Sequence, residues 1–108
     1  MDSIKELQEK IAQFTKERDW DQFHTPANLA KSISIEAGEL LECFQWDEKS
    51  YDRAAVEGEL SDVMNYCLQM ATALDLDVKE IIEKKMIENA KKYPVAKAKG
   101  KATKYDKL

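Results

Sequence analysis

The sequence contains few residues that break helices or cross-link chains. Its 108 residues include three glycines and two prolines, so we expect loops to be few and short. The two cysteines show no CxxC spacing, which disfavours a zinc site or a disulfide, and we interpret them as reduced core thiols. Neither a long apolar run nor a signal-peptide pattern is present, so we expect a soluble, cytoplasmic chain with no membrane partner.

Acidic residues outnumber basic residues over most of the chain. The formal net charge is −4. Residues 95–108 contain five lysines and one aspartate and therefore carry +4, which leaves −8 on residues 1–94. An acidic body disfavours extended contact with phosphate backbones. We therefore expect no stable nucleic-acid binding, and we interpret the basic tail as a solubilising segment; weak contact of this tail with nucleic acid or an acidic partner is the alternative.

Apolar residues recur at helical spacing in four segments, and no segment alternates as a strand would. The pattern predicts a first helix from Ser3, with Ser3 and Glu6 as a capping box. Thr25 and Pro26 fit the N-cap and first residue of a second helix. The expected helices after the first are 26–45, 51–74 and a segment that follows an N-cap at Asp77 and ends before Pro94. The sequence therefore predicts an all-α, four-helix bundle-like fold.

The four helices are predicted to form a single domain over residues 1–94. Residues 95–108 are expected to be a flexible tail unless Tyr105 docks it. The apolar stripe of the third helix is wide enough to bury two sides, one of them against another subunit. We therefore expect a homo-oligomer.

Two pairs of carboxylates interrupt the apolar patterns of the two central helices. In SISIEAGELLECFQW, Glu36 precedes Glu39 by three residues. In EGELSDVMNYCLQM, Glu59 precedes Asp62 by the same spacing. Residues three apart share a helix face, so the pairs can face each other if these helices pack together. Four like charges in a partly dry site repel, and a divalent cation would relieve the repulsion. Oxygen ligands favour Mg²⁺, with Mn²⁺ as a possible substitute.

Two other interpretations of the carboxylates compete with a magnesium site. A solvated acidic face is the usual role of such pairs, and it would suit a non-catalytic helical module that binds another protein. A di-iron centre also uses helical glutamates, but it needs a Glu-x-x-His motif on two helices. The one histidine of this chain, His24, lies in a predicted loop, which argues strongly against di-iron.

The order of motifs along the chain resembles a known enzyme family. The segments ERDWDQFHTPANL, EAGELLECFQW, GELSDVMNY and KKMIENAKKYP succeed one another over about residues 10–94. This succession is similar to the MazG-like all-α nucleoside triphosphate pyrophosphohydrolases, particularly their dCTP pyrophosphatase branch. The resemblance implies hydrolysis of a (d)NTP to a (d)NMP and pyrophosphate, with dCTP or a modified dCTP favoured. It also implies a role in cleaning the nucleotide pool, and a dimer or a tetramer built as a dimer of dimers.

The resemblance also implies roles for individual residues. Metal binding and catalysis would fall to Glu36, Glu39, Glu59 and Asp62. Substrate contacts would fall to Trp20, His24, Trp46, Tyr66, Lys85, Asn89 and Tyr93. The tryptophans would line the base pocket, His24, Tyr66 and Asn89 would contact the nucleotide, and Lys85 and Tyr93 would lie near the phosphates.

The residues themselves are compatible with these roles but do not require them. Tyr66 lies one turn after Asp62, beside the carboxylates. Trp20 and Trp46 flank the second helix, and each could stack on a base or simply pack. Lys85 and Asn89 are one turn apart and could meet one ligand or form an exposed face. Among the carboxylates, Glu36 is our candidate for the base that activates water.

Overall fold

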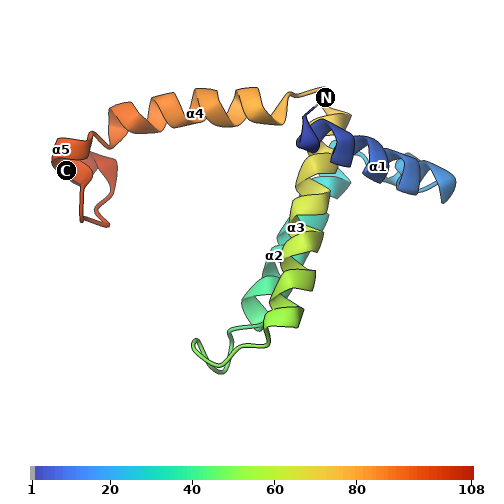
Figure 1. Ribbon diagram of the computed structural model, residues 1–108, viewed down its shortest axis with the longest axis horizontal. Coiled ribbons are helices and arrows are strands. Elements are labelled where there is room, and N and C mark those ends of the chain that lie inside the picture. The colour runs from blue at the N-terminus through green and yellow to red at the C-terminus, as the bar shows by residue number, and fades with distance from the viewer. Residues whose placement is uncertain (1) are drawn as a thin grey trace. The chain divides into compact units, whose positions relative to one another are not determined.

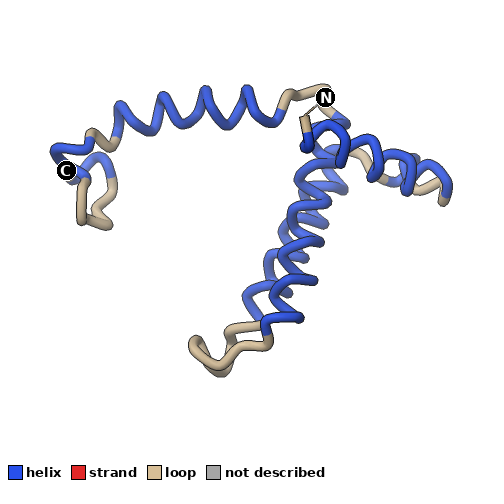
Figure 2. The backbone as a smooth tube through the Cα atoms, in the orientation of Figure 1, coloured by secondary structure: helices blue, strands red, loops and turns tan. Residues whose placement is uncertain are grey.

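The computed structural model, which describes residues 2–108, is built from helices (Figures 1 and 2). No strand occurs among the described residues, so the predicted all-α class is confirmed. The elements are α1 (Ser3–Glu17), η1 (Asp21–Phe23), α2 (Pro26–Glu42), α3 (Arg53–Ala73), α4 (Val78–Lys92), α5 (Val95–Ala98) and η2 (Tyr105–Lys107). The structure divides into two compact units, Met1–Leu76 and Asp77–Leu108.

Side-chain caps set the starts of the four long helices. Thr25 and Asp77 accept hydrogen bonds from backbone amides three residues ahead, as predicted. Asp52 caps α3 in the same manner. The predicted cap of α1 is wrong by one residue, because the Asp2 carboxylate accepts the hydrogen bond from the amide of Lys5. Ser3 is therefore the first helical residue and not the cap.

The first unit is organised around α2 and α3, which lie side by side along their length (Figure 1). Helix α1 packs against the C-terminal part of α3, where the Gln8 side-chain amide donates to Thr72 Oγ1 over 3.0 Å. The interior at this junction is small. Leu29 and Ala71 are the buried apolar residues, with 1% and 5% of their surfaces exposed. The pairing of α2 with α3 brings the two carboxylate-bearing segments next to each other.

The second unit contains α4 and the lysine-rich segment after it. The Tyr105 ring meets the Tyr93 ring edge-on, with 6.1 Å between centroids. The Lys92 ammonium lies 4.8 Å from the centre of the same Tyr105 ring. Tyr105 therefore contacts two residues at the C-terminal end of α4.

Large apolar side chains remain exposed on both units. Met64 of α3 is 56% exposed, and Met86 and Ile87 of α4 are 62% and 61% exposed. Monomeric proteins seldom leave so many large apolar side chains uncovered. None of the helices within residues 2–108 combines the length and the apolar character needed to cross a lipid bilayer.

Candidate metal and nucleotide site

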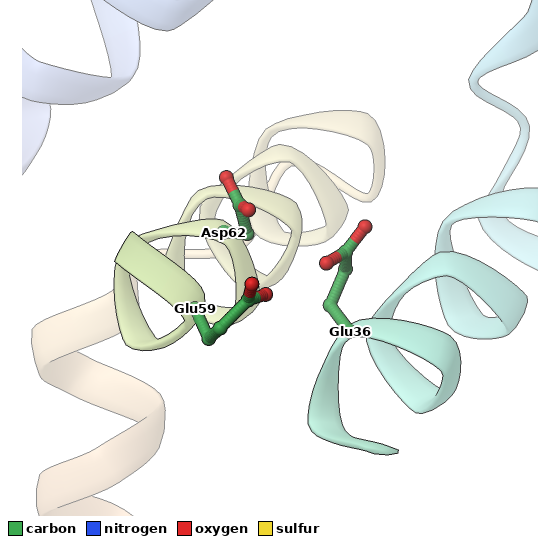
Figure 3. A group of neighbouring side chains, drawn as sticks. All are labelled: Glu36, Glu59 and Asp62. Carbon is green, nitrogen blue, oxygen red and sulfur yellow. The ribbon is translucent and has the colours of Figure 1, made fainter. Parts of the chain in front are cut away.

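Carboxylates from α2 and α3 converge in the first unit. Glu36 from α2 points toward Glu59 and Asp62 from α3 (Figure 3). One oxygen from each of the three lies within 4.8 Å of the others. The three-residue spacing sets Glu59 and Asp62 on one face of α3. The packing of α2 along that face then supplies Glu36.

Glu39 joins these three in one electrostatic cluster, which we call the acidic cluster: Glu36, Glu39, Glu59 and Asp62. A hydrogen bond shared with Glu39, partial burial and the nearby negative charges raise the pKa of Glu36 to about 7. Partial burial, a hydrogen bond shared with Glu39 and neighbouring charges also raise the pKa of Glu59. Without a cation, the cluster therefore retains protons that isolated carboxylates would lose.

The acidic cluster has the features of a site for a hard divalent cation. Glu36 Oε2 and Glu59 Oε2 are buried and accept no hydrogen bond from the described residues. Buried polar atoms normally have partners, so two such oxygens on facing helices need an explanation. The group that converges here offers carboxylate oxygens and no thiolate or imidazole, which is the ligand set preferred by Mg²⁺ and Mn²⁺. The residues present therefore fit such an ion.

A cavity of about 240 Å³ lies beside the acidic cluster, and we call it the aromatic cavity. Asp62 contributes to its wall, together with three predicted substrate residues, Trp20, His24 and Tyr66. The His24 and Tyr66 rings meet edge-on at 6.2 Å. His24 Nδ1 is buried and has no hydrogen-bond partner among the described residues. The wall of the cavity therefore combines a carboxylate of the acidic cluster, aromatic rings on which a base could stack, and a histidine whose Nδ1 has no hydrogen-bond partner among the described residues.

The remaining predicted substrate residues lie elsewhere in the chain. Trp46, in the connection after α2, is 89% exposed and lines none of the described cavities. Lys85 is on α4 of the second unit, where it pairs with Glu88 over 3.2 Å. Asn89 and Tyr93 belong to the same unit. The roles of these four residues stay predictions.

Sequence reasoning missed other residues in the wall of the aromatic cavity. Phe14 of α1 meets Trp20 edge-on at 5.9 Å. Asn65 and Gln69 of α3 also line the cavity. Their positions three and seven residues after Asp62 are a signal that could have found them, because this spacing places all three on one helix face. The contribution of Phe14 depends on how α1 packs on α3, which periodicity does not specify.

The chain is similar to known pyrophosphatases over nearly its full length. A model of the MazG-like family matches residues 31–108. The chain is 36% identical to dCTP pyrophosphatase 1 of Mus musculus and 35% identical to that of Homo sapiens, in each case covering 98% of this chain and 68% of the relative. A solved pyrophosphatase from Archaeoglobus fulgidus has a TM-score of 0.78 at 35% identity, covering 87% of this chain and 94% of that one.

These similarities agree with the fold and with the position of the acidic cluster. The matched family region begins in α2 and includes every carboxylate of the cluster. The relationship to dCTP pyrophosphatases predicted from the motifs is confirmed. The chain therefore belongs to the MazG-like family.

Proposed function

We propose that this protein is a magnesium-dependent pyrophosphohydrolase that converts a (d)NTP and water to a (d)NMP and pyrophosphate, with dCTP as a preferred substrate. The observation that carries the proposal is the acidic cluster, with two buried unpartnered oxygens, opening beside the aromatic cavity. The dCTP pyrophosphatases among its relatives support this reaction and this substrate. Removal of unwanted deoxynucleotides from the cellular pool is the corresponding biological role.

The acidic cluster would hold the metal. Bound there, Mg²⁺ would neutralise triphosphate charge and lower the pKa of a coordinated water. The carboxylates of Glu36 and Glu59 supply the two oxygens that lack partners. Glu39 and Asp62 complete a four-carboxylate site, which exceeds what one hydrated magnesium ion needs. We therefore expect more than one ion per site when substrate is bound.

Cleavage requires a group that removes a proton from the attacking water. Water adds to the α-phosphorus, the α–β bond breaks, and pyrophosphate leaves with the bonding electrons. Glu36 is the candidate base, because its partly buried carboxylate belongs to the acidic cluster, where the attacking water would be held. The remaining carboxylates position the reacting groups, which is the main task of a protein in phosphoryl chemistry.

The base and sugar would occupy the aromatic cavity. Trp20 offers a ring for stacking, and base–aromatic stacking is worth about 1–3 kcal/mol per base. His24 and Tyr66, which line the same cavity as Trp20 and Asp62, are proposed to contact the nucleotide next to its phosphates. Trp46 is proposed to complete the base pocket, and Lys85, Asn89 and Tyr93 are proposed to contact the nucleotide and its phosphates.

We propose that the working enzyme is a dimer or a dimer of dimers. The large exposed apolar side chains of α3 and α4, among them Met64, Met86 and Ile87, support this assembly. A second copy would cover apolar surface that the interior of one chain is too small to bury. A light-scattering mass equal to one chain would contradict this part of the proposal.

Product analysis tests the reaction. The purified protein is incubated with each common NTP and dNTP, with and without Mg²⁺, and the products are separated by ion exchange. Monophosphate and pyrophosphate are expected, only with metal, and fastest from dCTP. Diphosphate and orthophosphate would refute the cleavage position. Absence of turnover, together with no stabilisation by Mg²⁺, would favour the non-catalytic interaction module instead.

Variants test the acidic cluster. Glu39→Gln and Asp62→Asn are expected to abolish turnover while circular dichroism shows unchanged helicity. Glu57→Gln is the matched control, because Glu57 lies on the same helix as Asp62 but pairs with Arg53 at an exposed position. Near-normal turnover in both cluster variants would rule out the cluster as the catalytic centre.

A further inference from the structure

Two amide side chains of α3 stand in the aromatic cavity next to the acidic cluster. Gln69 Nε2 donates a hydrogen bond to Asn65 Oδ1 over 2.6 Å. Both residues line the cavity wall to which Asp62 contributes. The helical rise places Asn65 about 4.5 Å, and Gln69 about 10 Å, along the axis from Asp62. Asn65 therefore lies nearer to Asp62, and Gln69 lies farther from it along the helix.

The hydrogen bond within the pair leaves one amide NH2 group and one carbonyl oxygen wholly outside it. Asn65 Oδ1 is occupied, so the free group of Asn65 is its Nδ2 amide. Gln69 Nε2 is engaged, so its free group is Oε1. Neither free group has a hydrogen bond within residues 2–108. The wall of the aromatic cavity therefore carries a donor, Asn65 Nδ2, next to an acceptor, Gln69 Oε1.

The size and lining of the cavity suit a single ring better than a whole nucleotide. Its volume of about 240 Å³ is below the roughly 300–1,000 Å³ of sites that enclose drug-sized ligands. Phe14 and Trp20 supply the aromatic surface for stacking on such a ring. A nucleoside whose phosphates lie at the acidic cluster would extend along α3 into this space.

We propose that Asn65 and Gln69 read the Watson–Crick edge of a pyrimidine base and so set the base specificity of the enzyme, an inference that rests on the proposed pyrophosphohydrolase function. Asn65, nearer the phosphates, donates to N3 of cytosine. Gln69, farther along the helix, accepts from the N4 amino group. The two free groups of the pair are complementary to the two cytosine atoms.

The same pair can also receive thymine or uracil. If both amides rotate together, Asn65 Nδ2 donates to Gln69 Oε1 and the internal hydrogen bond is retained. The free groups are then Asn65 Oδ1 and Gln69 Nε2, which complement N3–H and O4 of thymine. The orientation in the structure complements cytosine, whereas thymine requires both amides to rotate. A side chain at position 69 that has no donor would therefore accept cytosine alone.

Gln69→Glu is the directional test, because a carboxylate at this position can only accept hydrogen bonds at neutral pH. The carboxylate cannot donate to Asn65 Oδ1, so Asn65 would turn its Nδ2 group toward it, with one hydrogen bonded to the carboxylate and the other facing N3 of cytosine. The carboxylate keeps the acceptor for the cytosine amino group and repels O4 of thymine. The ratio of kcat/KM for dCTP to that for dTTP should rise about tenfold, as expected when a polar contact is exchanged for a repulsive one. Asn65→Leu should lower kcat/KM for both substrates and bring the ratio closer to one. Gln13→Glu, an exposed amide bonded to Glu17 on α1, is the matched control and should leave the ratio unchanged.

The outcomes separate this inference from the function on which it rests. If the wild-type protein releases no monophosphate and pyrophosphate from any dNTP, the proposed function and this inference both fail. If the wild type turns over dCTP but Gln69→Glu changes the ratio by less than twofold, this inference alone fails. If a variant does not fold, titration of the ¹⁵N-labelled wild type with dCMP decides the question. The side-chain amide signals of Asn65 and Gln69 must then shift, and unshifted signals would overturn the inference.

Discussion

Removal of one negative charge from the acidic cluster should stabilise the metal-free protein, and the effect should depend on pH. The change is Glu36→Gln. In the folded protein the pKa of Glu36 is about 7, against an ordinary value of 4.5. Below pH 4.5 the carboxyl is neutral in both the folded and unfolded states, so it does not disfavour folding. As the pH rises through 7, the folded protein loses this proton too, and the ionised carboxylate then destabilises the fold.

The size of this effect follows from the pKa difference. One pKa unit corresponds to about 1.36 kcal/mol, so the full difference would be about 3.4 kcal/mol. The carboxylate is only partly buried, and solvent screens its repulsion, so we expect about 1–2 kcal/mol of stabilisation by Glu36→Gln at pH 8. For a chain of this length that is a rise of roughly 5–10 °C in Tm. At pH 4.5 the gain should fall to about 0.4 kcal/mol or less, because the unfolded carboxyl is then only half ionised.

Thermal melts followed by circular dichroism in EDTA, at pH 4.5 and pH 8, measure the difference. Glu57→Gln again serves as the matched control, since its exposed pair with Arg53 is worth little. Added Mg²⁺ should reverse the order at pH 8, because the wild type gains metal-binding energy that the variant lacks. A variant that is no more stable than the wild type at pH 8 in EDTA, or equally stabilised at both pH values, would refute the reasoning.

Three further predictions concern the metal, the cavity and the core. The affinity for Mg²⁺, measured by calorimetry, should increase between pH 6 and pH 8, because protons held by Glu36 and Glu59 compete with the metal; a flat profile would contradict this. Trp20→Ala should raise KM for dCTP by about 5- to 150-fold through lost stacking, and an unchanged KM would place the base elsewhere. Leu29→Ala should lower the free energy of unfolding, measured in urea, by about 2–5 kcal/mol, because Leu29 is 1% exposed. Lys31→Ala, at an exposed position on the same helix, is the control. An equal loss of stability in both variants would argue against a core at Leu29.

Local signals in the sequence were sufficient to predict the helices, but less so their ends. Thr25 and Pro26 identified the start of α2 correctly. Its predicted end at Gln45 is three residues too late, because α2 ends at Glu42. The Phe44 amide donates to the Leu41 carbonyl, which is the shorter three-residue spacing of a tightened last turn. The apolar pattern continues through such a turn, so periodicity alone does not reveal where the α-helix stops.

The acidic cluster was partly predictable, for a similar reason. Three-residue spacing predicted which carboxylates share a face, and the structure brings Glu36, Glu59 and Asp62 together. The aromatic cavity was harder to foresee, because it forms where α1 meets α3. The contact between Gln8 and Thr72 joins residues 64 positions apart in the chain. Helical periodicity carries no information about such a pairing, so it could not place Phe14, although the spacing from Asp62 could have indicated Asn65 and Gln69.

The near absence of an interior alters how this chain responds to mutation. Leu29, Ala71 and Thr15 are the buried residues of the described chain. In most domains the positions least tolerant of substitution are those hidden within a single subunit. Here few positions can be constrained in this way, and a saturation mutagenesis map should instead mark outward-facing residues such as Met64 and Met86. A survey that ranks variants by burial in one chain would therefore score as harmless many of the substitutions that matter most.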